Sequence, residues 1–258
     1  KKVKVIDGPS KYHNKVVDIL ILDSRIAEIK AGISPASPIK TIQGEDLHVS
    51  ISWLDIGTQV GEPGLEHRED WTTVSKAAKA GGYGAIAPFP NTQPSIQHKA
   101  DIQYIKQRAK SQGIGVYPIA SLSIDNQGAE ISEMYDLYTA GAAAFSDGLK
   151  SVSHAGLLAR ALEYVKPFEG LIIHYPSEKY LTQDAQMHEG EMSTLLGMKG
   201  MPSTAEAIGL KRDLELLAYT QSRMCVYGLS SLEAVKILKE AKKNLAEKLT
   251  AAVPYLNL

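Results

Sequence analysis

From residue 51 onward, short apolar segments alternate with longer segments of helical periodicity, and this alternation constrains the fold more than any other feature. Parallel strands cannot be joined by a tight turn and need a crossover connection, which is usually a helix. The alternation therefore predicts βαβ units and a parallel sheet. We expect strands over residues 51–56, 83–89, 115–120, 142–146, 171–174, 224–227 and 250–255.

Seven parallel strands indicate an α/β fold of the (β/α)8 TIM-barrel type that lacks its eighth strand. A closed barrel has no edge strand, whereas seven strands leave backbone donors and acceptors unpaired at a gap. We expect either more of the same polypeptide or another chain to close that gap. The predicted barrel domain covers residues 51–258, with its C-terminal part missing.

Residues 1–50 have a different pattern. Four short β-rich segments, at 3–6, 16–22, 25–29 and 40–42, are separated by turn residues such as Asp7-Gly8-Pro9. Short strands bounded by Gly, Pro, Asp and Ser are typical of antiparallel β structure. We therefore predict a separate small β-sandwich portion at residues 1–50.

Charge and hydropathy exclude several function classes. The formal net charge is -1, with Lys and Arg spread along the chain, so no basic patch for nucleic acid is expected. The longest apolar run, at 17–22, is far shorter than the ~20 residues of a membrane span. No signal peptide is evident, which predicts a cytoplasmic protein. The single cysteine, Cys225, lies in an apolar run and is interpreted as a buried hydrophobe.

Local signals mark several helix ends. The Ser-x-x-Glu sequences at 203–206 and 230–233 predict capping boxes. Gly81-Gly82 follows a helical segment and precedes a strand. A dinucleotide-binding loop has the opposite order, so these glycines are interpreted as a helix C-cap. Charges at helical spacing in 236–248 indicate a solvated helix face.

Function in such a barrel lies at the C-terminal ends of the strands. The side chains there that could ionise near neutral pH or bind a metal are Asp147 and His174. Asp147 could act in catalysis, or it could cap the next helix or shape a turn. His174 could be a metal ligand, although a hydrogen-bonded, non-ligating role is favoured by the small number of neighbouring ligands.

Several motifs together resemble dihydroorotases of the metal-dependent cyclic amidohydrolase family. They cover nearly the whole chain: the opening β segment at 17–27, Glu-Pro-Gly-Leu-Glu-His-Arg-Glu-Asp at 62–70, Ala-Gly-Gly at 80–82 with Pro-Asn-Thr-Gln-Pro at 90–94, Ala-Phe-Ser-Asp-Gly at 144–148, and the segments 189–190, 196–202 and 205–206. The resemblance implies a role connected with pyrimidine biosynthesis. It also implies that Asn91 corresponds to a substrate-binding residue, although an Asx-turn explains Asn91 equally well.

The resemblance also implies two zinc ions, and here the sequence departs from the family. The positions of the His-x-His ligands are Gly57 and Gln59, and that of the substrate-binding Arg is Gly61. The sixth-strand His is Gly228, the two His of the seventh strand are Leu256 and Asn257, and the eighth-strand Asp would follow Leu258. His174 remains as a vestigial candidate ligand.

Hydrolysis of a cyclic amide near pH 7 needs an activated water, which zinc supplies by lowering the pKa of the bound water to about 7. Such a zinc needs at least three protein ligands. We therefore expect no binuclear centre and no cofactor.

Three hypotheses follow. The first is a pseudoenzyme, a dihydroorotase-like scaffold or assembly partner. Silent relatives in the family imply aspartate transcarbamoylase as its partner, and we expect a homo-oligomer. The second is an active enzyme acting on dihydroorotate, a hydantoin or allantoin, with a reduced or rebuilt zinc site around His174 and Asp147. The third is a small-anion binding module that uses Asn91 and the helix start at Ser230.

Overall fold

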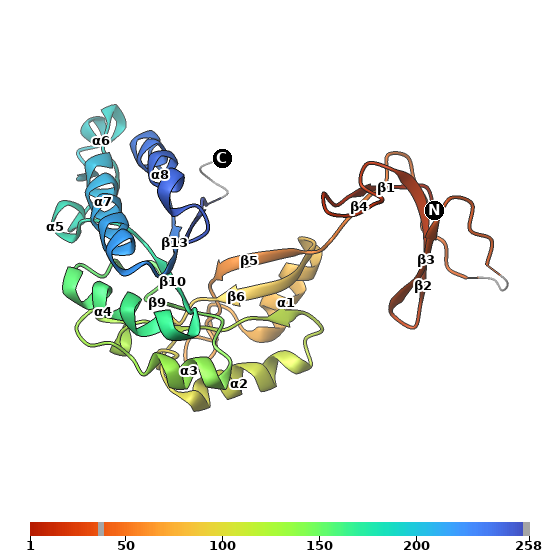
Figure 1. Ribbon diagram of the computed structural model, residues 1–258, viewed down its shortest axis with the longest axis horizontal. Helices are drawn as coiled ribbons and strands as arrows, with labels where there is room; N and C mark the ends of the chain where they lie inside the picture. Colours follow the sequence, from red (N-terminus) through yellow and green to blue (C-terminus); the bar gives the residue numbers. More distant parts are fainter. Residues whose placement is uncertain (36–38, 255–258) are drawn as a thin grey trace. The chain divides into compact units, whose positions relative to one another are not determined.

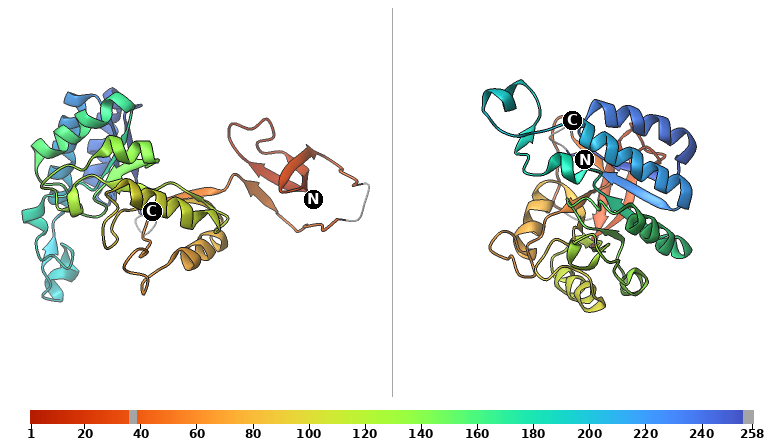
Figure 2. Two further views of the ribbon diagram at one scale, coloured as in Figure 1. Left: turned by 90° about the horizontal axis from the view of Figure 1, so that it is seen from below. Right: turned by 90° about the vertical axis from the view of Figure 1, so that its left-hand side faces the viewer.

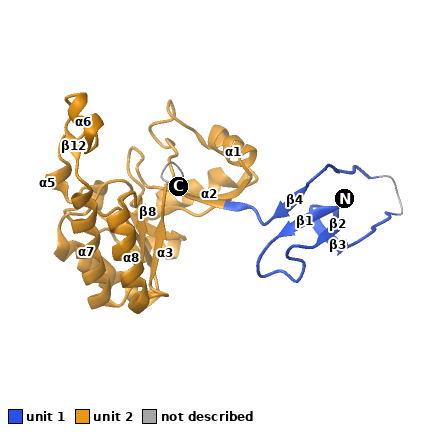
Figure 3. Cartoon of the chain, turned by 90° about the horizontal axis from the view of Figure 1, so that it is seen from above, with its two compact units in different colours: residues 1–53 blue, residues 54–258 orange. Residues whose placement is uncertain are grey.

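The computed structural model describes residues 1–35 and 39–254. The chain divides into two compact units, Lys1–Trp53 and Leu54–Leu258, which are coloured separately in Figure 3. Among the described residues, no helix is long and apolar enough to cross a membrane.

The first unit is built on a four-stranded sheet with the order β3-β2-β1-β4. Its strands are β1 (Val3–Ile6), β2 (Val16–Leu22), β3 (Arg25–Lys30) and β4 (His48–Ser50). The β1–β2 and β2–β3 pairs are antiparallel, as expected, but β4 pairs with β1 in parallel. Within the described part of this unit the strands form this single sheet, so the β-sandwich at residues 1–50 stays a prediction.

The prediction of a strand at 40–42 is wrong. These residues form no ladder, and the fourth strand is β4 instead. The β-branched residues Thr41 and Ile42 favour an extended chain, but a strand also needs a partner along its length. The backbone of this segment is instead contacted by the N-terminal amino group of Lys1, which donates to the Ile42 carbonyl at 2.6 Å.

The second unit follows the predicted βαβ pattern, with strands and helices alternating along the chain in Figure 1. Two sheets carry the repeating pattern, one with the order β5-β6-β7 and one with the order β14-β13-β10-β9-β8, and a separate two-stranded sheet joins β11 to β12. The pairs β6–β7, β8–β9, β9–β10, β10–β13 and β13–β14 are all parallel. The strands are β5 (Trp53–Thr58), β6 (Tyr83–Pro88), β7 (Gly115–Val116), β8 (Ile119–Ser121), β9 (Ala144–Ser146), β10 (Leu171–His174), β13 (Arg223–Tyr227) and β14 (Leu249–Ala252).

The predicted strand at 115–120 is divided into β7 and β8. Pro118 lies at the break and has no N–H to donate to a ladder. The backbone still continues across the break, because Tyr117 N–H donates to the Ile86 carbonyl at 2.9 Å and Ala143 N–H donates to the Pro118 carbonyl at 2.8 Å. Counted with this interruption, the described strands occupy seven positions, and β5 and β14 are the two edges.

Helices cover the strands and enclose the core. The helices are α1 (Trp71–Ala80), α2 (Lys99–Lys110), α3 (Met134–Ala140), α4 (Ala155–Val165), α7 (Ser203–Thr220) and α8 (Leu232–Leu245). An excursion between β10 and α7 carries α5 (Lys179–Thr182), β11 (Met187–His188), α6 (Glu191–Leu195) and β12 (Gly200–Met201). Figure 2 shows α7 and α8 side by side, and α4 also contacts α7.

The buried residues of α4 show why these segments form helices. Leu157, Leu158, Ala161, Leu162 and Val165 are all fully buried, at a spacing that places them on one face of a helix. Burial of each large aliphatic side chain contributes roughly 1.5–3 kcal/mol. The tertiary structure therefore stabilises a helix that has no acidic residue in its first turn and no basic residue in its last.

Helix ends agree with the sequence in part. Gly81 is the C-cap of α1, as predicted. The cap of α8 is Ser231, whose hydroxyl accepts from Ala234 N–H at 3.1 Å. The predicted capping box beginning at Ser230 is not formed, because the residue three positions after the cap is Ala234, which has no side chain that could bond back. The box at 203–206 is not formed, because α7 begins at Ser203 and Glu206 contacts Ser230 instead.

A buried carboxylate connects the loop after β5 to two helices. Glu62 accepts from Trp71 N–H at 3.2 Å, from the Tyr104 hydroxyl at 2.6 Å and from Arg108 Nε at 2.7 Å. Burial by itself would raise the pKa of Glu62, but these three donors outweigh it and hold the pKa below its ordinary value. The carboxylate is thus a charged anchor for α1 and α2.

Candidate functional site

The strand ends that would carry metal ligands in the family resemblance are packed by aromatic rings. Gly57, in β5, has φ +90, and a Cβ there would lie 2.7 Å from Tyr227 Oη and 2.8 Å from Phe89 Cε2. Gly228, after β13, has φ +80, and its Cβ would lie 2.8 Å from the Tyr175 ring. Phe89 and Tyr227 pack edge to face with ring centroids 5.0 Å apart. Any side chain at Gly57 or Gly228 would therefore displace a ring.

His174, the last residue of β10, uses both ring nitrogens in hydrogen bonds. It is 1% exposed, and its Nδ1 is 2.6 Å from Asp213 Oδ2. Its Nε2 accepts from Val152 N–H at 2.9 Å. Nε2 must carry the lone pair, so Nδ1 carries the proton that His174 donates to Asp213. Neither nitrogen is left for a metal.

Asp213, on α7, lies at the centre of a buried charged network. Its Oδ1 accepts from Arg212 Nε at 2.9 Å and Nη2 at 2.7 Å. Arg212 Nη1 also donates to the Ser153 carbonyl at 3.1 Å. The network therefore holds the loop after β9 at two points, Val152 through His174 and Ser153 through Arg212.

Asp147, directly after β9, contacts the neighbouring loop. Ser123 donates to it twice, from its N–H to Oδ1 at 2.9 Å and from its hydroxyl to Oδ2. Burial raises the pKa of Asp147, although both donors oppose that effect. The predicted capping of the next helix is not seen, since the N-cap of α4 is His154.

Asn91 does not form the Asx-turn that was the alternative explanation. Its Nδ2 donates to the Asp147 carbonyl at 3.2 Å, and its Oδ1 is buried without a hydrogen-bond partner among the described residues. Gly148 packs closely on it, because a Cβ at Gly148 would lie 1.8 Å from Asn91 Oδ1. The assignment of Asn91 as a substrate-binding residue stays a prediction.

The helix start at Ser230 is already occupied by an internal carboxylate. Glu206 accepts from Ser230 N–H at 3.0 Å, from the Ser230 hydroxyl at 2.6 Å and from Ser231 N–H at 3.4 Å. An external anion would compete with a carboxylate that is already held in place. The prediction of an anion site at this helix start is therefore wrong.

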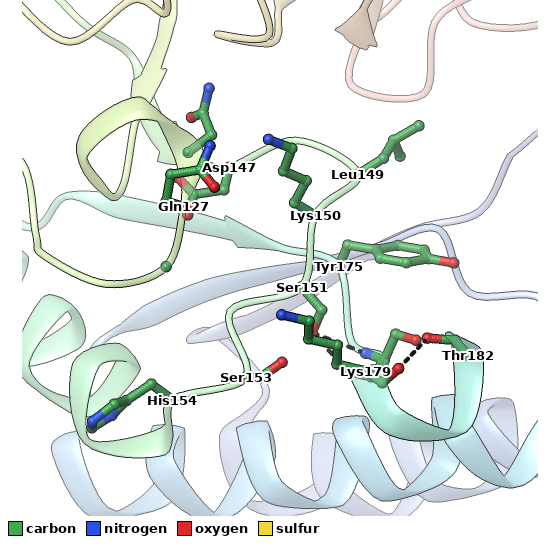
Figure 4. Close-up of a pocket in the computed structure, with 13 residues that line it drawn as sticks. Gln127, Asp147, Leu149, Lys150, Ser151, Ser153, His154, Tyr175, Lys179 and Thr182 are labelled. Atoms are coloured by element: carbon green, nitrogen blue, oxygen red, sulfur yellow. Dashed lines mark hydrogen bonds between the residues drawn. The ribbon is translucent and has the colours of Figure 1, made fainter. Parts of the chain in front are cut away.

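A cavity of about 420 Å³ lies beside Asp147, between the loops that follow β8, β9 and β10. Figure 4 shows Lys150, Ser153 and Lys179 around it. Sequence reasoning did not find this cavity, because its lining comes from three separate loops and matches no motif. The structure thus brings Asp147 together with residues that the sequence analysis did not single out.

A family model described as "Dihydro-orotase-like" matches residues 49–234. The chain belongs to this dihydro-orotase-like family. Its curated relatives include the dihydroorotase of Geobacter sulfurreducens, 35% identical over 240 residues, which cover 93% of this chain and 56% of that protein. The dihydroorotase of Acetivibrio thermocellus is 37% identical over 240 residues, which again cover 93% of this chain and 56% of that protein. The chain therefore spans little more than half the length of these relatives.

Solved structures support the barrel fold of the dihydro-orotase-like family. L-Hydantoinase (dihydropyrimidinase) from Arthrobacter aurescens has a TM-score of 0.76 at 16% identity, covering 100% of this chain and 58% of that one. D-Hydantoinase from Thermus sp. has a TM-score of 0.69 at 17% identity, covering 98% and 56%. At these identities the likeness concerns the fold, and it confirms the predicted α/β barrel class.

The zinc ions implied for this family do not fit the described residues. Within residues 1–35 and 39–254, no group of three or more His, Cys, Asp or Glu is placed to hold a metal ion. Aromatic rings fill the space at Gly57 and Gly228, and His174 has no free nitrogen. Leu256 and Asn257 lie outside the described residues. We derive no chemical step through zinc.

Proposed function

We propose that this chain is a non-catalytic member of the dihydro-orotase-like family that acts as a scaffold or assembly partner in pyrimidine biosynthesis. The observation that carries the proposal is the packing of Phe89, Tyr175 and Tyr227 into the space next to Gly57 and Gly228. Positions that had merely lost their ligands would leave a polar space open to water. Here the space is filled by three aromatic rings, of which Phe89 is buried and Tyr175 and Tyr227 are partly buried.

Exposed apolar residues support a role in assembly. Leu195 on α6 is 75% exposed, and Met192, Leu196 and Met198 beside it are also exposed. A group of exposed apolar side chains is typical of a protein–protein contact. On the family resemblance we propose aspartate transcarbamoylase as the partner, and self-association into a homo-oligomer. The cytoplasmic location is proposed on the sequence arguments alone.

The test is metal content combined with activity. We expect zinc well below one ion per chain by elemental analysis after incubation with zinc and desalting, and no hydrolysis of dihydroorotate. The curated dihydroorotases among its relatives favour the alternative, an active hydrolase of dihydroorotate, a hydantoin or allantoin. At least one zinc ion per chain, with hydrolysis of one of these substrates that His174→Ala abolishes, would establish that alternative and refute the proposal.

The partner is tested separately by size-exclusion chromatography with light scattering. We expect the purified chain alone to have the mass of an oligomer, and to co-elute with purified aspartate transcarbamoylase at a defined ratio. Leu195→Lys should weaken whichever contact uses α6, while Lys76→Gln on α1 serves as a surface control. Independent elution of the two proteins would refute the partner assignment.

A further inference from the structure

The cavity beside Asp147 is built on a firmly held loop. Two hydrogen bonds fix the loop of residues 147–154. His174 accepts from Val152 N–H, and Arg212 donates to the Ser153 carbonyl. The Ser151 hydroxyl also donates to the Ser177 carbonyl at 2.8 Å. These contacts come from β10, α7 and the segment after β10. The residues that line the cavity from this loop are therefore pre-organised, which lowers the cost of binding a ligand.

Two cations reach this cavity from different segments. Lys150 belongs to the loop after β9, and Lys179 is the first residue of α5. Figure 4 shows the two side chains extending in similar directions. Neither ammonium group forms a salt bridge within the described residues, and the buried carboxylate of Asp147 accepts hydrogen bonds from Ser123. The cavity lining therefore carries two ammonium groups and the single carboxylate of Asp147, which leaves it with an excess of positive charge.

Two residues that line the cavity, Asn126 and Ser153, each have a buried polar atom with no hydrogen-bond partner among the described residues. Asn126 is 4% exposed, and its Oδ1 is buried without a hydrogen bond, although its Nδ2 contacts the Pro90 carbonyl at 3.4 Å. The Ser153 Oγ is likewise buried without a partner. A buried polar atom without a partner costs about 1–3 kcal/mol. An amide oxygen only accepts hydrogen bonds, so a ligand that bonds to Asn126 Oδ1 must carry an N–H or O–H group.

We propose that this cavity binds a small oxyanion that also carries an O–H or N–H donor. Lys150 and Lys179 would hold the anionic oxygens, Ser153 would donate to one of them, and Asn126 Oδ1 would accept from the ligand. Hydrogen phosphate is the simplest anion with both features. The volume of about 420 Å³ falls in the range of small-molecule sites, so a phosphate bearing an organic substituent also fits. The inference goes beyond the scaffold function and does not depend on it.

The test compares phosphate with sulfate, because at pH 7 phosphate keeps a proton that sulfate lacks. Isothermal titration of the purified chain at matched ionic strength should give one phosphate site per chain, with sulfate binding at least about tenfold more weakly, the loss expected for one buried hydrogen bond. Equal affinity for the two anions would refute the assignment of Asn126. The absence of saturable binding up to about 10 mM phosphate would refute the whole site.

Substitutions distinguish the contribution of the two lysine charges from that of the hydrogen bond between the ligand and Asn126. Lys150→Gln and Lys179→Gln should each weaken phosphate and sulfate by about fivefold, since both lysines are exposed at the rim. Asn126→Leu should lower the phosphate-to-sulfate preference toward one without weakening sulfate. If Asn126→Leu fails to fold by circular dichroism, Ser153→Ala replaces it and should weaken phosphate several-fold.

The matched control is Lys76→Gln, which removes one exposed lysine on α1 outside the cavity. It should bind phosphate like the wild type. Equal weakening by Lys76→Gln and Lys150→Gln would mean that net charge, and not this cavity, attracts the anion, and the proposal would fail. None of these measurements depends on zinc or on dihydroorotate, so their outcome is distinct from that of the scaffold test.

Discussion

The substitution Gly57→Ala tests directly whether the ligand position has been filled by aromatic packing. The new Cβ would lie within 2.8 Å of atoms in both Tyr227 and Phe89, closer than any relaxed contact. Forcing a methyl group into a packed site costs about 1–3 kcal/mol. The residue also has φ +90, which adds roughly 1–2 kcal/mol for a side chain other than glycine. We expect a total loss of about 2–5 kcal/mol in the free energy of unfolding.

Gly82→Ala is the matched control, because it separates the two costs. Gly82 has φ +81, close to that of Gly57, but a Cβ there would have no atom within 4 Å. It should therefore lose only the backbone contribution of about 1–2 kcal/mol. The difference between the two variants isolates the steric contribution of the rings.

The measurement is urea unfolding followed by tryptophan fluorescence. Trp71 is 1% exposed in the core of the second unit, so its emission should shift when that unit unfolds, whereas Trp53 is already exposed. Tyr227→Ala combined with Gly57→Ala should cost less than the sum of the two single changes, because it removes two of the three closest atoms. A loss in Gly57→Ala no greater than in Gly82→Ala would refute the view that the position is filled.

Three further predictions concern stability. His174→Ala leaves the Asp213 carboxylate without one of its partners and should cost about 2–4 kcal/mol in urea unfolding. His188 is exposed, so His188→Ala should change stability by less than about 0.5 kcal/mol. Glu62 has a folded pKa below its unfolded value, so its contribution is fully present above about pH 4.5 and is lost as the pH falls through the folded pKa. The stability difference between wild type and Glu62→Gln should therefore shrink in acid, and a difference that is constant with pH would contradict this sign. Ser231→Ala removes the cap of α8 and should cost about 1 kcal/mol by thermal unfolding, while Ser230→Ala, if Ser231 is the true cap, should leave α8 capped.

Much of the fold could be predicted because the signals are local. The alternation of strands and helices identified all seven strand positions of the second unit, within about two residues at most ends. Gly81 ended α1 as its position predicted. The strand predictions were wrong where the β preference of the local sequence was not matched by pairing with a strand distant in the sequence. Pro118 interrupts a strand whose neighbours on both sides are fixed by tertiary pairing, and 40–42 found no partner strand.

The sequence alone determined which chemistry is available at the strand ends, because glycine has no side chain to offer in any fold. What only the tertiary structure decided is how the remaining groups are used. His174 meets Asp213 39 residues away, and Asp147 meets Ser123 24 residues away. Lys150 and Lys179 likewise face one cavity from different loops. Periodicity and motif spacing report on neighbours along the chain, whereas these contacts are set by how helices and loops pack across the sheet, so they become visible only in three dimensions.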